Sequence, residues 1–201
     1  MASGRKLKFD KEQALEAAMQ VFWKKGYLGA SLTDLTQGMG INKPSLYATF
    51  GNKESLFVQA TEHYLEQYAK PKVTLLHTPD TPFLERLKNY LMAVVRGQCE
   101  ESEFKGCYIS LCVVEAAGEG MPEQALASIT FASEYAQTML AELFETDADA
   151  KRLGFAVDAE ENALFLMTVV NGTAAMARAG KTVDELQTVI ERALLGLKRE
   201  N

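Results

Sequence analysis

Side chains that can bind phosphate recur at short intervals between residues 31 and 53 of this chain. Lys43 and Tyr47 are four residues apart, so a helix through them would place an ammonium and a phenol hydroxyl on one flank. Lys53 follows at the expected start of the next helix. Side chains of these types contact nucleic-acid phosphates without reading the base sequence. The chemistry that this spacing indicates is binding to a polyanion.

The same stretch offers a small surface for reading bases. Lys43 can donate to guanine, and Pro44, Ala48 and the Thr49 methyl can contact the methyl group of thymine. The expected second helix contains no Arg, so we expect DNA shape to contribute to specificity. The residues expected at the DNA are Ser31, Thr33, Lys43, Pro44, Ser45, Tyr47, Ala48, Thr49 and Lys53.

Two short helices must position these residues. Ser31, with Asp34 three residues later, is typical of a helix N-terminus, and Gly40 follows the expected end of that helix. Asn42 is expected to cap the second helix, with Pro44 in its first turn. Two short helices joined by a tight turn containing glycine are a helix-turn-helix. Short capped helices also occur in bundles that bind nothing, but the polar set opposite Leu46 favours binding.

The sequence from Asn42 to Phe57 reads N-K-P-S-L-Y-A-T-F-G-N-K-E-S-L-F. It resembles the DNA-binding domain of the TetR family of bacterial transcriptional repressors, over roughly the first third of the chain. The matching residues are Gly26, Tyr27, Ser31, Leu35, Gly40, Ile41, Pro44, Ser45, Leu46, Tyr47, Phe50, Lys53, Glu54, Leu56 and Phe57. The resemblance implies a homodimeric repressor that binds a double-stranded DNA operator of two-fold symmetry and is released by a small-molecule effector, as yet unidentified.

Charge is divided unevenly along the 201 residues. The net charge is −6, but residues 1–54 hold eight Lys and Arg against five Asp and Glu, which leaves the remainder at −9. A basic segment that also carries the motif points to nucleic acid at that end. The alternative, a generally acidic protein with a basic start by chance, does not explain this coincidence.

Composition and periodicity predict an all-α protein of about nine helices. Glycine and proline are few, at 14 and 5 residues, and alternating apolar patterns are rare. We expect a three-helix DNA-binding domain with its linking helix in residues 1–70 and a helical ligand-binding and dimerisation domain in residues 71–201. The linking helix is expected to run from Lys53 to Lys70 and to end before Pro71. The basic arm from Arg5 to Lys8 is expected to reach DNA or to be an ordinary frayed end.

The last two helices carry more apolar surface than a small domain can cover, which suggests a subunit interface. Capping pairs are expected at Asp158 with Glu161 and at Thr182 with Glu185. The resemblance implies that these two helices of each protomer form a four-helix dimer interface, and an ordinary bundle core is the alternative. The expected interface residues are Leu164, Gly172, Ala175, Leu186, Ile190 and Leu194.

A helix expected to begin at Gly106 is apolar almost all round, so we expect it in the middle of a domain. Cys107 lies at its start, where the helix dipole favours a thiolate, and this leaves a redox or electrophile sensor open as an alternative to small-molecule release. An enzyme or binding protein using a helical pocket is a further alternative. The candidate ligand or redox residues are Cys107, Glu115, Phe131, Tyr135 and Met167.

Other chemistries find little support in the sequence. There is no phosphate-binding glycine motif or nucleophile elbow, and neither His63 nor His77 has neighbours at zinc-site spacing. We therefore expect no enzyme activity, cofactor or metal. Three cysteines suit a reducing compartment, and no secretory signal or membrane-spanning run is apparent. The expected location is cytoplasmic.

Overall fold

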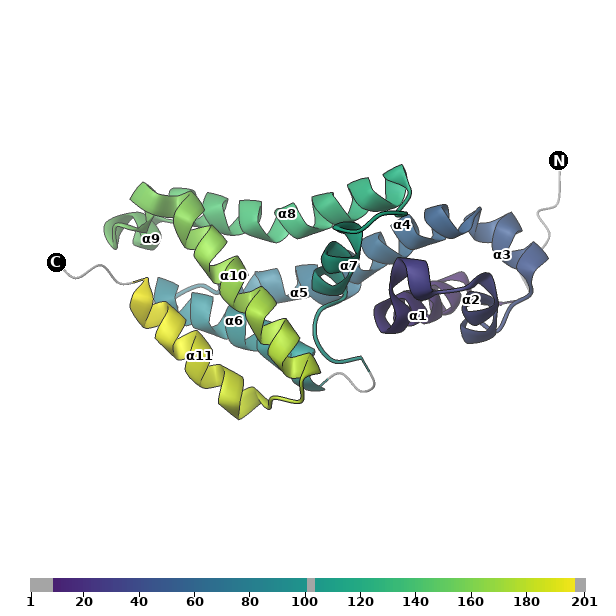
Figure 1. Ribbon diagram of the computed structural model, residues 1–201. Coiled ribbons are helices and arrows are strands. Elements are labelled where there is room, and N and C mark those ends of the chain that lie inside the picture. The colour runs from purple at the N-terminus through teal and green to yellow at the C-terminus, as the bar shows by residue number, and fades with distance from the viewer. Residues whose placement is uncertain (1–8, 101–103, 198–201) are drawn as a thin grey trace.

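The structure is a computed structural model that describes residues 9–100 and 104–197. Within these ranges the chain forms eleven α-helices and no strand, and nine of the helices have at least seven residues. This confirms the predicted all-α fold. The basic arm from Arg5 to Lys8 lies outside the described residues. Figure 1 shows an elongated molecule with the first three helices at one end and the last helix toward the other.

The N-terminal helices begin where their capping residues predict. Asp10 accepts hydrogen bonds from the N–H groups of residues 12 and 13, and Asn42 accepts one from Ser45 at 2.9 Å. Ser31 and Asp34 form a reciprocal capping box, so two otherwise unpaired donors are satisfied. The helices at this end are α1 (Lys11–Gly29), α2 (Leu32–Gly38), α3 (Lys43–Phe50) and α4 (Lys53–Tyr64).

The prediction that the linking helix ends before Pro71 is wrong. The helix continues past Pro71 through a change of helix type. α4 passes into a π-helical turn over Leu65–Ala69, then into α5 (Lys70–Val73) and a 3₁₀ turn over Thr74–His77. Proline has no N–H, and its ring clashes with the carbonyl four residues earlier. A π turn widens the helix at that point and relieves the clash, so the chain continues in the same direction.

The remaining helices form the larger end of the molecule. Figure 1 shows α8 along one side, with α10 crossing between α8 and α6. Thr182 forms the predicted capping box with Glu185, but Asp158 makes no side-chain cap because its backbone leaves the extended conformation that capping needs. The helices are α6 (Phe83–Glu100), α7 (Tyr108–Ala116), α8 (Glu123–Thr146), α9 (Ala148–Arg152), α10 (Ala159–Arg178) and α11 (Val183–Gly196).

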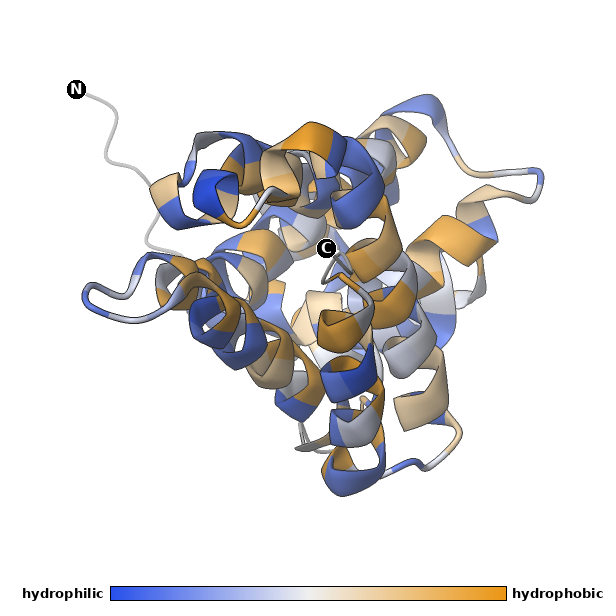
Figure 2. Ribbon diagram, turned by 90° about the vertical axis from the view of Figure 1, so that its left-hand side faces the viewer, coloured by the Kyte–Doolittle hydropathy of each residue, from blue (hydrophilic) through white to orange (hydrophobic). Residues whose placement is uncertain are grey.

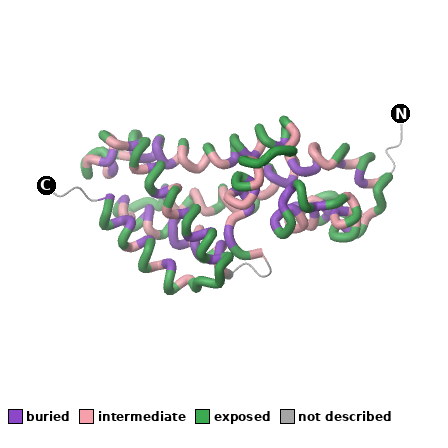
Figure 3. Tube along the Cα trace, in the orientation of Figure 1, coloured by how far each residue is buried: buried purple, intermediate pink, exposed green. Residues whose placement is uncertain are grey.

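Two hydrophobic cores divide the described residues. One joins α1 to α4 with α7 and the first half of α8, and it includes Tyr108, Cys112 and Ile129. The other joins α6, the second half of α8, α10 and α11. Figure 2 shows hydrophobic and hydrophilic residues as stripes along the helices, and Figure 3 shows the buried stripes turned inward. The N-terminal core therefore extends into the sequence beyond residue 70.

Helix α7 is not surrounded by protein, contrary to the prediction from its apolar sequence. Tyr108 and Cys112 are fully buried, but Val114 is 75% exposed in this single chain. The buried positions are four residues apart, so only one face of α7 packs on α1 and α8. The other face remains at the surface.

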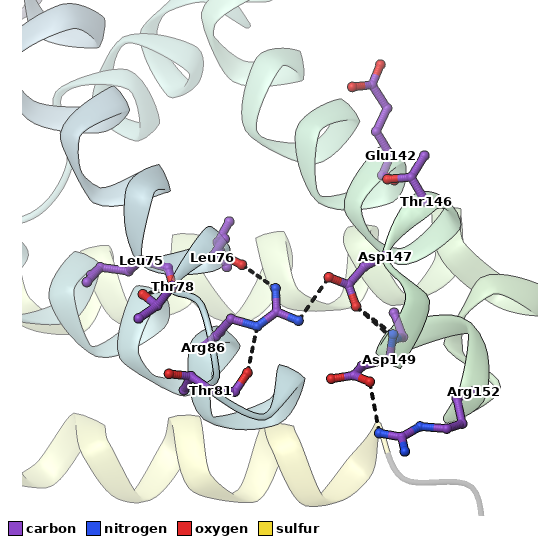
Figure 4. Close-up of polar contacts among 11 residues, drawn as sticks. Leu75, Leu76, Thr78, Thr81, Arg86, Glu142, Thr146, Asp147, Asp149 and Arg152 are labelled. Atoms are coloured by element: carbon purple, nitrogen blue, oxygen red, sulfur yellow. Dashed lines mark hydrogen bonds and ion pairs between the residues drawn. The ribbon is translucent and has the colours of Figure 1, made fainter.

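At the end of the molecule far from α3, Arg86 forms a group of hydrogen bonds that we call the arginine clamp (Figure 4). Arg86 donates to the carbonyls of Leu76 at 2.5 Å and Thr81 at 3.0 Å, and to Asp147 Oδ2 at 2.9 Å. Burial alone would raise the pKa of Asp147, but hydrogen bonds from the Ala150 N–H and the Arg86 guanidinium outweigh it and lower the pKa. The clamp fastens the loop before α6 to the junction of α8 and α9.

Candidate nucleic-acid interface and ligand cavity

Helix α3 presents a mixed polar and apolar surface to solvent. Lys43, Pro44 and Ala48 are exposed, and Tyr47 is 49% exposed. Ser45 and Thr49, which are also among the residues expected at the DNA, are half-buried. Leu46 and Phe50 pack inward, as predicted. The exposed residues form one continuous edge along the first two turns of α3.

The α2 residues expected at DNA are partly used in local structure. The Ser31 hydroxyl donates to Asp34 Oδ2 at 2.7 Å and accepts from the Asp34 N–H at 3.1 Å. Lys25 Nζ lies 2.5 Å from Asp34 Oδ1, and the hydrogen bonds from Lys25 and Ser31 hold the pKa of Asp34 well below its usual range. Thr33 is exposed one position before Asp34. These contacts show that Ser31 acts as the N-cap of α2.

Lys53 is held against an aromatic ring. Its Nζ lies 4.5 Å from the centroid of the Tyr27 ring, within the range of a cation–π contact. Burial lowers the pKa of Lys53, and the negative charge of Glu115 acts in the opposite direction. Lys53 is half-buried at the first position of α4, so its ammonium has a defined position near α3.

The backbone below Lys53 is fixed by Glu115, which lies 88 positions after Tyr27 in the sequence. Glu115 accepts hydrogen bonds from the N–H of Tyr27 at 2.6 Å and of Leu28 at 2.7 Å. These bonds lie where Gly26, with φ +71°, interrupts α1. Glu115, a candidate ligand residue from the sequence, is half-buried and has these two backbone partners.

Further contacts join α1 and α4 to helices from later in the sequence. Arg178 donates to the Trp23 carbonyl at 3.1 Å, and Glu54 Oε1 accepts from the Gln124 N–H at 3.0 Å. Inside the N-terminal core, the hydroxyls of Thr61 and Tyr108 are 3.0 Å apart. Charged and backbone groups on α7, α8 and α10 thus meet α1 and α4 directly.

A cavity of about 580 Å³ lies where these helices meet. Aromatic residues from five elements line it, namely Trp23, Tyr64, Tyr68, Tyr90 and Tyr135. The Tyr64 and Tyr68 rings are stacked, with centroids 5.4 Å apart and 8° between their planes. The π turn that follows Tyr64 carries Tyr68 on this wall. Such a volume with mostly apolar walls suits a small organic molecule.

The cavity includes three of the five predicted ligand residues. Cys107, Tyr135 and Met167 line it, whereas Glu115 is directed to α1 and Phe131 is 64% exposed outside it. Phe131 lies outside the cavity because the inner face of α8 carries Ala132 and Ile129. No sequence pattern indicated Trp23, which comes from α1, but the four-residue spacing of Tyr64 and Tyr68 could have indicated an aromatic wall.

The three cysteines have different surroundings. Cys107 is the N-cap residue of α7, half-buried, with Sγ 3.5 Å from the Tyr64 hydroxyl. Cys112 is buried, and burial raises the pKa of its thiol, as does the charge of Glu115. Cys99 contacts the Lys181 carbonyl at 3.7 Å. Within the part of the chain that the structure describes, these cysteines form no disulfide.

The predicted dimer residues divide into two groups. Leu164, Gly172 and Ala175 are exposed on α10. The α11 residues differ from the prediction, because this chain's own second core buries them: Leu186, Ile190 and Leu194. The exposed apolar residues of α11 are Val189 at 41% and Leu195 at 62%.

Two further properties concern the described residues as a whole. In residues 9–100 and 104–197, no three His, Cys, Asp or Glu side chains are grouped so that they could hold a metal ion. In the same ranges, no helix combines the length and the apolar character needed to cross a membrane.

Residues 14–60 match the family described as "Bacterial regulatory proteins, tetR family". The chain is 31% identical to the HTH-type transcriptional repressor BdcR of Escherichia coli K12, over 91% of this chain and 86% of BdcR. It is 28% identical to the HTH-type transcriptional repressor ComR of the same organism, over 92% of this chain and 88% of ComR.

Solved structures share the whole arrangement of helices. A cysteine mutant of the TetR family transcriptional regulator CifR, complexed with 26 bp double-strand operator DNA, is 33% identical with a TM-score of 0.84, covering 95% of this chain and 98% of CifR. A TetR family regulator from Agrobacterium tumefaciens is 20% identical with a TM-score of 0.76, over 94% of this chain and 97% of that one. The latter likeness concerns the fold alone.

Proposed function

Because this chain belongs to the TetR family of bacterial regulatory proteins, we propose that it is a repressor that leaves a palindromic operator when a small molecule enters the cavity between its two cores. The protein is a DNA-binding transcriptional regulator. Its relatives are regulators and not enzymes, and we extend this to the chain itself. The direction of control and the effector are the parts that we propose.

The observation that carries the proposal is the exposed edge of α3, formed by Lys43, Pro44, Tyr47 and Ala48. It lies on the same helix-turn-helix that matches the family, in a fold that a related regulator uses on operator DNA. We assign α3 to the major groove, with Lys43 toward a base and Tyr47 and Lys53 toward phosphates. Thr33 would contact the backbone from α2.

The protein acts as a homodimer on double-stranded DNA. We propose that exposed residues of α10 and α11 form the interface, because apolar side chains there have no cover within the single chain. They are Leu164, Phe165, Gly172, Ala175, Met176, Val189 and Leu195. Two-fold symmetry would then place the two α3 helices in successive major grooves, about 34–36 Å apart.

We infer an uncharged and mostly apolar effector from the cavity walls. Five aromatic rings line the space. Of the charged residues that also line it, Arg178 donates to the Trp23 carbonyl, Lys72 donates to the Tyr68 carbonyl, and Glu134 is exposed. Because both cationic side chains are already hydrogen-bonded to the backbone, a charged ligand would exchange its hydration for mostly apolar walls, which is costly. The effector can shift the protein from its DNA-bound form only by as much as it binds the other form more tightly.

The test has two stages. Selection of DNA from a random duplex pool should yield a site with two-fold symmetry, and a set of uncharged aromatic compounds should then be screened for release of that duplex. Binding in the cavity should change the fluorescence of Trp23, the single tryptophan. An asymmetric selected site, or a fluorescence change without release of DNA, would contradict the proposal. No observation here favours sensing through Cys107 over ligand binding.

A further inference from the structure

The carboxylate of Glu115 occupies a cradle of backbone N–H groups on α1. Gly26 has φ +71°, and the next two N–H groups, of Tyr27 and Leu28, both point at the carboxylate at 2.6 and 2.7 Å. Successive N–H groups beside a residue of positive φ form an anion-binding nest. A Cβ atom on Gly26 would lie 2.6 Å from Glu115 Oε2, so a side chain at position 26 would expel the carboxylate.

The nest lies directly below a residue of the DNA-binding surface. Tyr27, whose N–H is held by Glu115, places its ring under the Lys53 ammonium, with 4.5 Å between Nζ and the ring centroid. The Tyr27 ring also packs on Phe57 of α4, with centroids 5.0 Å apart. A shift of the Tyr27 backbone would therefore move the support on which Lys53 rests.

On the other side, Glu115 belongs to a helix that forms a wall of the cavity. Figure 1 shows α7 between α1 and the helices of the second core. The α7 residues that line the cavity are Ile109, Ser110, Leu111, Val113 and Val114, and Glu115 comes next along the chain. A helix moves as a unit, so an occupant that displaces α7 also displaces Glu115. Short charge-assisted hydrogen bonds depend steeply on distance and direction.

We propose that Glu115 is a positioning residue that transmits the state of the cavity to Lys53 through the backbone of Tyr27. In the empty protein the carboxylate holds Tyr27 and hence keeps Lys53 in place for a DNA phosphate. When α7 moves, the nest opens and Lys53 loses its support. The ligand-dependent part rests on the function proposed above, whereas the effect of Glu115 on DNA binding does not.

The first test compares Glu115→Gln with Glu119→Gln on a duplex selected by the wild-type protein. Glutamine keeps the length of the side chain but its amide nitrogen cannot accept a hydrogen bond, so one nest bond and the charge are lost. Glu119 is exposed three residues after Ala116 and provides the same change of net charge. We expect Glu115→Gln to bind on the order of tenfold more weakly. Glu119→Gln should bind as the wild type does.

The dependence of DNA affinity on salt concentration tests whether Glu115 acts through Lys53. Lys53→Ala should reduce the slope of log K against log salt by about 1, because one phosphate contact is lost. Glu115→Gln should reduce it by the same amount, and the double variant should bind no more weakly than Lys53→Ala alone. Additive losses in the double variant, or a wild-type slope in Glu115→Gln, would show that Glu115 does not act through Lys53.

Hydrogen exchange without DNA separates positioning from general stability. In Glu115→Gln the amides of Tyr27 and Leu28 should exchange faster, while the melting temperature and the exchange of the second core stay close to those of the wild type. Faster exchange throughout the N-terminal core, or no change at these two amides, would overturn the proposal. If the wild type holds DNA in the presence of every compound tested, the effector hypothesis fails, but the role of Glu115 in DNA binding is still decided by the salt slopes.

Discussion

Lys43 and Lys53 carry the same charge but occupy different environments. Lys43 is exposed at the start of α3, where its long side chain can follow a base edge. Lys53 is half-buried over the Tyr27 ring, and burial lowers its pKa. An ammonium with a fixed position suits a phosphate, which recurs at a fixed place in every DNA duplex. We therefore assign specificity to Lys43 and general affinity to Lys53.

This assignment predicts different outcomes for two alanine variants. Lys43→Ala should relax the base preference at one position of each half-site, because a direct contact to guanine is removed. Lys53→Ala should weaken binding to all sequences and leave the preferred site unchanged. Selection from random duplexes, carried out with each variant, measures both effects. An unaltered site for Lys43→Ala would count against base reading by this residue.

At the scale of helices, the sequence predicted features that depend on neighbouring residues better than it predicted contacts between residues far apart in the chain. Ser31, Asn42 and Thr182 cap helices as expected, because capping depends on neighbours within three residues. The bond from Tyr27 to Glu115 joins residues 88 positions apart. Its two partners belong to helices whose sequences give no sign of facing each other, so the pattern of neither helix could reveal it.

The linking helix and α7 show two other limits of sequence patterns. Pro71 predicts a helix end because proline lacks an N–H, yet a π turn over Leu65–Ala69 accommodates it within one continuous path. The apolar sequence of α7 predicted full burial, but Val114 is 75% exposed. In the proposed cavity site, Cys107, Tyr135 and Met167 were predicted, while Trp23 required knowledge of how α1 packs.

The arginine clamp makes a prediction about stability and pH. Arg86→Met should destabilise the fold by roughly 3–5 kcal/mol, because Asp147 would remain mostly buried without its charged partner. Asp149→Asn is the control, since its partner Arg152 has a side chain that is 76% exposed, and such pairs contribute little. Chemical denaturation at neutral pH measures the free energy of unfolding of both variants. Equal effects of the two variants would show that the clamp is not the stabilising contact.

The pH dependence follows from the lowered pKa of Asp147. A group with a lower pKa in the folded state adds stability above its unfolded pKa, which is about 3.9 for Asp, and this stability is lost as the pH falls through the folded value. The difference in unfolding free energy between wild type and Asp147→Asn should thus be largest near neutral pH and shrink below about pH 4. A difference that stays constant with pH would indicate that the charge of Asp147 is irrelevant.

For the whole molecule, burial distinguishes side chains that serve the core from those available to a partner. Leu194→Glu would place a carboxylate inside the chain's own second core and cause unfolding. Phe165, 42% exposed on α10, and Val189, 41% exposed on α11, are better probes. The sequence pattern could not separate these classes, because a helix between two apolar surfaces shows one broad apolar stripe.

We expect Val189→Glu and Phe165→Glu to give folded monomers, because each places an unpaired charge in the proposed interface. Val157→Glu is the control, since Val157 is 74% exposed but lies at the turn before α10. Sedimentation measures the mass and circular dichroism the helix content. Dimers that persist in both interface variants would require a different interface.

The N-terminal core limits how this protein can be recombined with its relatives. Because α7 and the first half of α8 complete the packing around Phe57, a fragment ending at residue 70 would leave an apolar surface uncovered. A chimera that exchanges only the DNA-binding helices inherits Tyr27 from one parent and its carboxylate partner from the other. Successful exchange of operator specificity should therefore require α3 alone to be replaced, or α1 to α4 together with α7 and the beginning of α8.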